Sequence, residues 1–365
     1  MKPDIGKICF FTLLYQEVYC DVYHGSLTEE CVVTDFSQVT EAVESCQSTI
    51  LSNFDVPAGE TLMLPLRDGT KLTFRGIITF EYSERSDYLV MINGTNVVID
   101  GEEDSILNGQ GELYWDGKGT SGSKKPKFFA LELHKSVMKN MNILNAPMHC
   151  AQLFNSTDVL LSGWVIDNQA GFQAPLGKNT DGFNVRNGSN IVIENSLVFN
   201  QDDCVALNSG SNILIDNLTC YGSHGLSISV GFSQDVFELN SLQNVTFRNS
   251  SVTGGDNGIH IKTHVDAGLG LIQNVTYQDI QLIDIVKKGI GVEENYGGAK
   301  NVSARNNIPI RNLILENIVG SVNITAVPIY ILCAEDGCFD WTFANVMIEG
   351  SRENSCNFTP DDFIC

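Results

Sequence analysis

The sequence has few basic residues and no long apolar run. Its 22 lysines and arginines stand against 44 aspartates and glutamates, so the formal net charge is −22. No basic cluster marks a nucleic-acid footprint, and this charge repels a phosphate backbone. No apolar run reaches the ~20 residues of a transmembrane helix. We therefore expect neither a nucleic-acid partner nor a membrane partner, and a polyanionic ligand would require a locally basic cleft.

The sequence has the marks of an oxidising, secretory environment. It contains eleven cysteines and ten N-x-S/T sequons, among them Asn93, Asn217, Asn244, Asn274 and Asn357, a combination typical of secreted, extracellular proteins. Residues 1–25 read as a signal peptide or an N-terminal extension, because two lysines precede a short apolar run that acidic residues interrupt. Hydrophobic residues make up 43% of the chain, and we expect residues 26–365 to form one large domain.

A short phrase recurs along the chain: a polar residue, three β-forming residues, then a polar residue. It reads "NVVID" at 96, "NIVIE" at 190, "NILID" at 212, "NVTFR" at 244, "NVTYQ" at 274 and "NLILE" at 312. Copies repeat at 22 residues, or at 30 to 38 where a loop intervenes. This spacing predicts an all-β fold, a parallel β-helix of about ten coils. A β-sandwich with evenly spaced strands is the alternative.

The repeat turns sequence spacing into distance, because residues one coil apart lie about 4.8 Å apart. Asp181 precedes Asp202 and Asp203 by 21 and 22 residues, and His224 follows them by 22 and 21. We therefore expect these groups to stack on three successive coils. His260 and Lys262, and then Tyr296, continue the same column on later, looped coils.

Two adjacent aspartates conflict with strand geometry, which points neighbouring side chains to opposite faces. An unpaired carboxylate turned inward would cost several kcal/mol. The pair Asp202 and Asp203 therefore predicts a turn or bulge at the strand end that directs both carboxylates to one cleft.

This column suits hydrolysis of a glycosidic bond in an acidic sugar polymer. One carboxyl must donate a proton while another activates water, and crowded carboxylates have pKa values that are pushed apart. Lys262 is expected to meet a substrate carboxylate. A solvated acidic face or a calcium site is the alternative for such a cluster.

At these residues the chain resembles the polygalacturonases of glycoside hydrolase family 28, of the endo-acting type. The resemblance runs from about Cys31 to Cys365 and includes "NTDGF", "QDDCVA", "SHGLSI", "IKT" and "ENYG" in the family's order. It implies a right-handed parallel β-helix that cleaves α-1,4 bonds of pectin or polygalacturonate with inversion, without a metal or cofactor. It also implies a monomer, with a plant polygalacturonase-inhibiting protein as a further partner.

The resemblance assigns roles by position. Asp202 is the general acid, Asp181 and Asp203 hold and activate the water, and His224 supports the protonation of the acid. The implied substrate-binding residues are Asn179, His260, Lys262 and Tyr296. The implied disulfides are Cys31–Cys46, Cys204–Cys220, Cys333–Cys338 and Cys356–Cys365, with Cys150 unpaired and Cys9 and Cys20 inside the signal segment.

Three places depart from the family pattern. His260 replaces an arginine that clamps the substrate carboxylate, and an imidazole lacks the bidentate fork and is charged only in acid. Asn184 replaces an aspartate. Ser229 and Val230 stand where the family prefers glycine followed by serine. The alternative functions are an impaired homologue that binds pectin fragments or the inhibitor, and an enzyme acting on a modified pectic substrate. Pectate lyase shares the fold, but it needs calcium and an arginine base. A purely structural β-helix gives no reason for the aspartate column.

Overall fold

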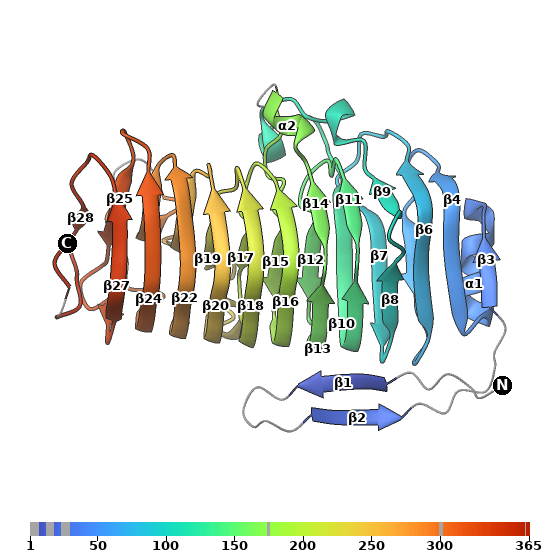
Figure 1. Ribbon diagram of the computed structural model, residues 1–365, viewed down its shortest axis with the longest axis horizontal. Helices are drawn as coiled ribbons and strands as arrows, with labels where there is room; N and C mark the ends of the chain where they lie inside the picture. Colours follow the sequence, from blue (N-terminus) through green and yellow to red (C-terminus); the bar gives the residue numbers. More distant parts are fainter. Residues whose placement is uncertain (1–6, 12–17, 23–29, 174–175, 299–301, 362) are drawn as a thin grey trace.

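A computed structural model describes residues 7–11, 18–22, 30–173, 176–298, 302–361 and 363–365. The elongated body in Figure 1 carries the blue N-terminal strands at one end and the red C-terminal strands at the other. β1 (Lys7–Phe11) and β2 (Val18–Val22) pair antiparallel in a sheet of their own. These two strands lie in the predicted signal segment, whose other residues fall outside the described part of the chain. Cleavage of this segment stays a prediction.

Strands at intervals of about one coil stack in parallel into one column, here called the site column. Its members are β5 (Leu62–Pro65), β7 (Tyr88–Thr95), the first part of β10 (Lys127–Lys139), β12 (Ala151–Phe154), β15 (Phe183–Arg186), β17 (Val205–Leu207), β19 (Leu226–Val230), β21 (Asn257–His264), β23 (Lys288–Tyr296), β25 (Val327–Leu332) and β28 (Ser355–Cys356). Each strand pairs with the strand of the next coil.

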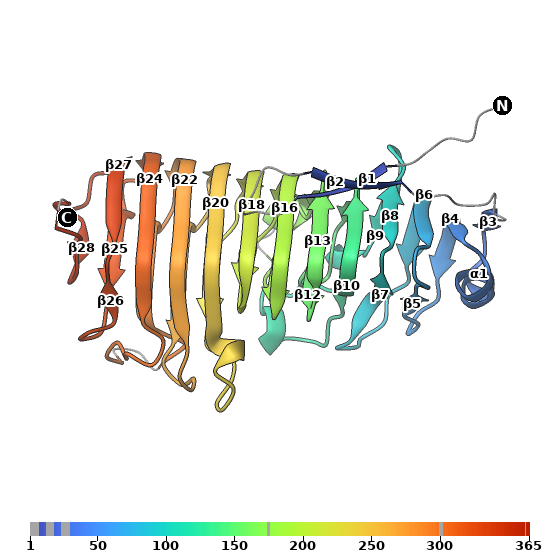
Figure 2. The same cartoon turned by 90° about the horizontal axis from the view of Figure 1, so that it is seen from below.

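The remaining strands form the other faces of the coil. They are β3 (Glu30–Val33), β4 (Ser48–Val56), β6 (Lys71–Phe80), β8 (Val98–Gly101), β9 (Ile106–Asn108), β11 (Asn142–Leu144), β13 (Thr157–Ser162), β14 (Val165–Asp167), β16 (Gly188–Phe199), β18 (Gly210–Tyr221), β20 (Ser241–Thr253), β22 (Leu271–Ile285), β24 (Ile310–Val322), β26 (Cys338–Phe339) and β27 (Thr342–Glu349). β16, β18, β20, β22 and β24 lie side by side in Figure 2.

A long strand contributes to two faces of the coil. Residues 189–194 of β16 pair with β13, and residues 197–199 pair with β14. Between them Asn195 has φ of 51°, a left-handed conformation that asparagine tolerates and that bends the strand. The described strands from β3 to β28 pair in parallel throughout, so the predicted parallel β-helix is confirmed.

The recurring phrase has a structural cause. Its first residue occupies a left-handed corner, with φ between 51° and 56° at Asn190, Asn212, Asn244, Asn274 and Asn312. The side-chain amide of each donates to the asparagine or aspartate one coil earlier, at 2.8 to 3.1 Å. The apolar residues of the phrase alternate into the bore, where Ile191, Ile213 and their counterparts are buried. The repeat therefore encodes both the corner and the core of each coil.

The ends and the cysteines stabilise this column. The short helix α1 (Val39–Ser45) buries Val39, Ala42 and Val43 in the core. The four predicted disulfides are confirmed, and Cys150 is a free, buried thiol. α2 (Ala170–Gln173) stands in the loop that follows β14 (Figure 1). In the described residues, no helix has the length and apolarity to cross a membrane.

Candidate active site

The site lies just before the N-terminal ends of four successive strands of the site column. β12, β15, β17 and β19 pair in register through Ala151, Phe183, Val205 and Leu226. The residues two positions earlier, His149, Asp181, Asp203 and His224, therefore occupy equivalent positions on neighbouring coils. The sequence prediction that Asp181, Asp203 and His224 stack is confirmed by this register. The prediction that His260, Lys262 and Tyr296 continue the same column is wrong. Ser227 pairs with His260, Ser229 with Lys262 and His264 with Tyr296, so these residues lie farther along their strands.

Glycines allow these coils to approach closely. A Cβ on Gly182, next to Asp181, would lie 2.4 Å from the carbonyl oxygen of Cys204 on the next coil. Gly225, next to His224, has φ of 103°, a conformation that other residues rarely adopt. Larger residues at either position would push the coils apart beside the carboxylates.

Asp202 and Asp203 lie at a bend just before β17, so strand alternation does not apply to them. The backbone N–H of Asp203 donates to Oδ1 of Asp202 at 2.8 Å. The two carboxylates then diverge to different partners. The bend that the adjacent pair predicted is present.

Asp202 is held by a histidine and an amide. His224 Nδ1 lies 3.1 Å from Asp202 Oδ1, and Asn179 Nδ2 donates to Asp202 Oδ2 at 3.1 Å. Burial acts to raise the pKa of Asp202, but the hydrogen bond and charge of His224 outweigh it and lower that pKa to about 2. The second ring nitrogen of His224 lies 3.2 Å from Asp256 Oδ2. Burial opposes protonation of His224, but the hydrogen bonds to both aspartates raise its pKa to about 10, so the imidazole carries a proton at neutral pH.

The pKa of Asp181 shifts in the opposite direction from that of Asp202. Burial, followed by the charges of Asp202 and Asp203, raises the pKa of Asp181 well above its ordinary value. Asn184 Nδ2 donates to Asp181 Oδ2 at 2.9 Å, whereas buried Oδ1 has no hydrogen-bond partner among the described residues. Asp181 therefore retains a proton under conditions in which Asp202 is ionised.

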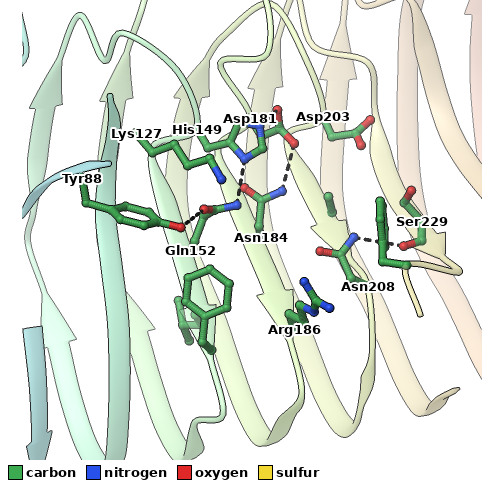
Figure 3. A pocket seen from close by; sticks show the side chains of 14 residues that line it. Tyr88, Lys127, His149, Gln152, Asp181, Asn184, Arg186, Asp203, Asn208 and Ser229 are labelled. Carbon is green, nitrogen blue, oxygen red and sulfur yellow. Dashed lines mark hydrogen bonds and ion pairs between the residues drawn. The ribbon is translucent and has the colours of Figure 1, made fainter. Parts of the chain in front are cut away.

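A chain of hydrogen bonds ends beside Asp181. Tyr88 donates to Gln152 Oε1 at 2.7 Å, so the amide nitrogen of Gln152 is directed to His149 Nδ1, at 2.8 Å. This nitrogen must then accept, which places the ring proton of neutral His149 on Nε2. Nε2 lies 3.6 Å from Asp181 Oδ1. Burial lowers the pKa of His149 to about 4. Figure 3 shows the hydrogen bonds from Tyr88 through Gln152 to His149, which lies beside Asp181.

Asp203 forms a buried ion pair. Its Oδ2 lies 2.7 Å from Lys262 Nζ, and Ser227 donates to its Oδ1 at 2.7 Å. The side chains of the pair are 5% and 6% exposed. Burial opposes the charge on Lys262, but Asp203 raises the pKa of the amine. In the structure the amine of Lys262 binds Asp203, and its expected contact with the substrate stays a prediction.

His260 is also engaged within the protein. Its Nε2 lies 2.9 Å from Glu293 Oε2, and Asn257 Nδ2 lies 3.2 Å from its Nδ1. Burial is the main cause that lowers the pKa of His260, against the opposing hydrogen bond to Glu293. Tyr296 is partly exposed, and the amine of Lys262 lies 5.3 Å from its ring centre.

Beside the carboxylates lies a pocket of about 330 Å³. Its walls come from successive site-column coils and include Tyr88, Lys127, His149, Gln152, Phe154, Asp181, Asn184, Arg186, Asp203, Asn208, Ser229 and Phe232. Asp181, Asn184 and Arg186 lie on or beside one strand, β15, and Arg186 lies farther along it (Figure 3). The structure adds Tyr88, Lys127, His149, Gln152, Arg186, Asp256 and Glu293 to the residues found from sequence. The 32-residue interval from His149 to Asp181, which equals a looped-coil spacing of the repeat, was a signal for His149.

Two groups bring metal-binding residue types together. Side-chain atoms of Asp202, Asp203 and His224 lie within 4.8 Å of one another. The amine of Lys262 already pairs with the carboxylate of Asp203, and protonated His224 donates toward Asp202, so these atoms are engaged within the protein. Glu294 lies beside Cys333 and Cys338, whose sulfurs form a disulfide and are not available as thiolate ligands. The chemistry of the first group suits proton transfer better than metal binding.

The model of the glycosyl hydrolases family 28 matches residues 46–365. The chain belongs to this family. A polygalacturonase of Phaedon cochleariae is 40% identical over 342 residues, covering 92% of this chain and 93% of that protein. A probable endopolygalacturonase A of Aspergillus kawachii is 41% identical over 341 residues, covering 92% and 90%. Endopolygalacturonase I from Stereum purpureum, solved with two galacturonates, superposes with a TM-score of 0.80 at 29% identity, covering 90% and 96%. This chain is thus a family 28 glycoside hydrolase.

Proposed function

We propose that this family 28 hydrolase is an endopolygalacturonase that cleaves α-1,4-galacturonosyl bonds of pectin with inversion. The supporting observation is the cluster of Asp181, Asp202, Asp203 and His224, which three successive coils present beside one pocket. The names of its relatives from Phaedon cochleariae and Aspergillus kawachii support the substrate, and the name of the second relative supports the endo action. Residues 26–365 form the catalytic domain in this proposal.

The proposed reaction uses one proton shared among the crowded carboxyls. In the free site this proton lies on Asp181, while charged His224 keeps Asp202 ionised. In the reacting form the proton lies on Asp202, and Asp181 is ionised. The two forms carry the same net charge, because one proton moves between two carboxyls that titrate as a coupled group. Asp202 protonates the leaving glycosidic oxygen. Water attacks the anomeric carbon from the other face and gives its proton to Asp181.

The other residues of the site hold this arrangement and the sugar. Asp203, fixed by Lys262 and Ser227, orients the water together with Asp181. Asn179 directs Asp202, and Tyr296 offers a partly exposed ring to a sugar face. Lys262, whose amine lies beside Asp203, and His260, which is bound to Glu293, are the further residues proposed to bind the sugar. No step in this scheme requires a metal.

The test is the release of reducing ends from de-esterified polygalacturonate between about pH 4 and 7. Asp202→Asn and Asp181→Asn should each lower kcat by a factor of about 10² or more. Asp216→Asn, which removes a carboxylate bound to Arg248 on another face, should leave kcat unchanged. Proton NMR should show the new reducing end appearing first as the β anomer. Full activity of Asp202→Asn, or an initial α anomer, would contradict the proposal.

A second candidate is a homologue with impaired turnover that binds pectin fragments or a polygalacturonase inhibitor. The observation that favours it is His260, which stands in place of a carboxylate-clamping arginine and whose ring is occupied by Glu293 and Asn257. An inert wild type together with an active His260→Arg variant would support this candidate. An active wild type would exclude it.

We also propose that the enzyme is a secreted monomer. The four disulfides support an oxidising compartment, because such bonds do not persist in a reducing cytosol. Release of the protein into the culture medium with its disulfides intact is the measurement that checks secretion, and the mass of the particle in solution checks the monomer.

A further inference from the structure

A protein with a net charge of −22 must bind a polyanion through charges that its own acids have not neutralised. Most cations near the carboxylates fail this requirement. Lys262 pairs with Asp203, Lys288 pairs with Glu293, and Lys287 pairs with Asp256. His224 lies between two aspartates. None of these groups has a charge left free for the carboxylates of a ligand.

Lys127 and Arg186 differ from these cations. Both line the pocket and both are half-buried. Among the described residues, no carboxylate lies within the 4.0 Å that defines an ion pair with either side chain. The amine of Lys127 lies 5.5 Å from the ring centre of Tyr88. Burial lowers its pKa, against the opposing charge of Asp181.

These two cations lie in different directions from Asp181. Lys127 begins β10, and the register through Phe129, Ala151 and Phe183 places it two coils before Asp181, about 10 Å away along the helix axis. Arg186 ends β15, on the same coil as Asp181 but farther along the strand (Figure 3). A chain of charged sugars that crosses the pocket therefore meets positive charge at two separate points.

We propose that Lys127 and Arg186 are the substrate-carboxylate anchors of this cleft, each binding a carboxylate of one galacturonate chain. The inference rests on the proposed function and names the residues that make its cleft locally basic. Guanidinium binds a carboxylate through two parallel hydrogen bonds, while an ammonium acts as a point charge. Because both cations are half-buried, solvent screens them less than it screens surface charges. The cleft therefore selects free carboxylates over methyl esters, which carry no charge.

The test measures binding of galacturonate oligomers by calorimetry, in an Asp202→Asn parent that does not turn the ligand over. Arg186→Gln and Lys127→Gln should each raise the Kd by about tenfold, and Arg186→Lys should recover part of the loss. Arg248→Gln and Lys139→Gln are matched controls, because they remove equal charge from cations paired with Asp216 and Asp100 on other faces. They should leave the Kd within about twofold, as expected for screened charges.

The same substitutions in the active enzyme give a second readout. Arg186→Gln should raise KM for polygalacturonate with kcat little changed, and it should narrow the preference for de-esterified over methyl-esterified substrate. Equal Kd values for the parent, Arg186→Gln and Lys127→Gln would overturn the inference while leaving the proposed function intact. A wild type that neither binds nor cleaves the oligomers would overturn the proposed function and the inference with it.

Discussion

Replacing Lys262 with methionine should remove the positive half of a buried ion pair. Lys262 Nζ and Asp203 Oδ2 are 2.7 Å apart, and their side chains are 5% and 6% exposed. At an effective dielectric constant of about 20, two unit charges at this distance attract by about 6 kcal/mol. Desolvation of the pair cancels part of this attraction. The variant leaves Asp203 with the single donor Ser227, and we expect the free energy of unfolding to fall by about 3–5 kcal/mol.

The assay is denaturant unfolding followed by circular dichroism, with a double-mutant cycle. Adding Asp203→Asn removes the unpaired charge, so the double variant should regain about 2 kcal/mol over Lys262→Met. Arg248→Met is the matched control: it breaks a pair with Asp216 whose arginine is 44% exposed, and it should cost less than about 1 kcal/mol. A cost for Lys262→Met as small as that of the control, or no recovery in the double variant, would refute the reasoning.

Three further predictions concern other parts of the site. The pKa of His224 is raised from 6.5 to about 10. The stabilisation that protonated His224 gives the folded protein is therefore complete below pH 6.5 and is lost as the pH rises through about 10. The difference in melting temperature between wild type and His224→Gln should narrow over this range. Gln152→Leu frees the ring of His149 and should lower kcat about tenfold with little change in KM, and an unchanged kcat would count against the hydrogen-bonded chain. Replacing Cys204 and Cys220 with serine opens a loop with a sequence separation of 16 and should cost about 3 kcal/mol in chemical unfolding; stability equal to wild type would contradict this.

The sequence alone determined the architecture and the stacking of the acids. In a β-helix the repeat length is also the distance between contacts, so 21- and 22-residue intervals place Asp181, Asp202, Asp203 and His224 on neighbouring coils. The asparagine at each corner predicts the bend between two faces of the coil, because few other residues adopt its left-handed conformation. The adjacent aspartates predicted an irregular backbone before β17, because a regular strand would bury one of the two charges.

The tertiary structure alone decided which group faces which. Lys262 binds Asp203 across 59 residues, and Tyr88 binds Gln152 across 64; loops of unequal length separate these pairs, so the repeat does not predict them. The same structure gave Asp181 and Asp202 opposite pKa shifts, because burial dominates at Asp181 and the charge of His224 dominates at Asp202. A periodic sequence predicts which coils are neighbours. The charge state of a side chain depends on everything packed around it, and only the folded chain brings those groups together.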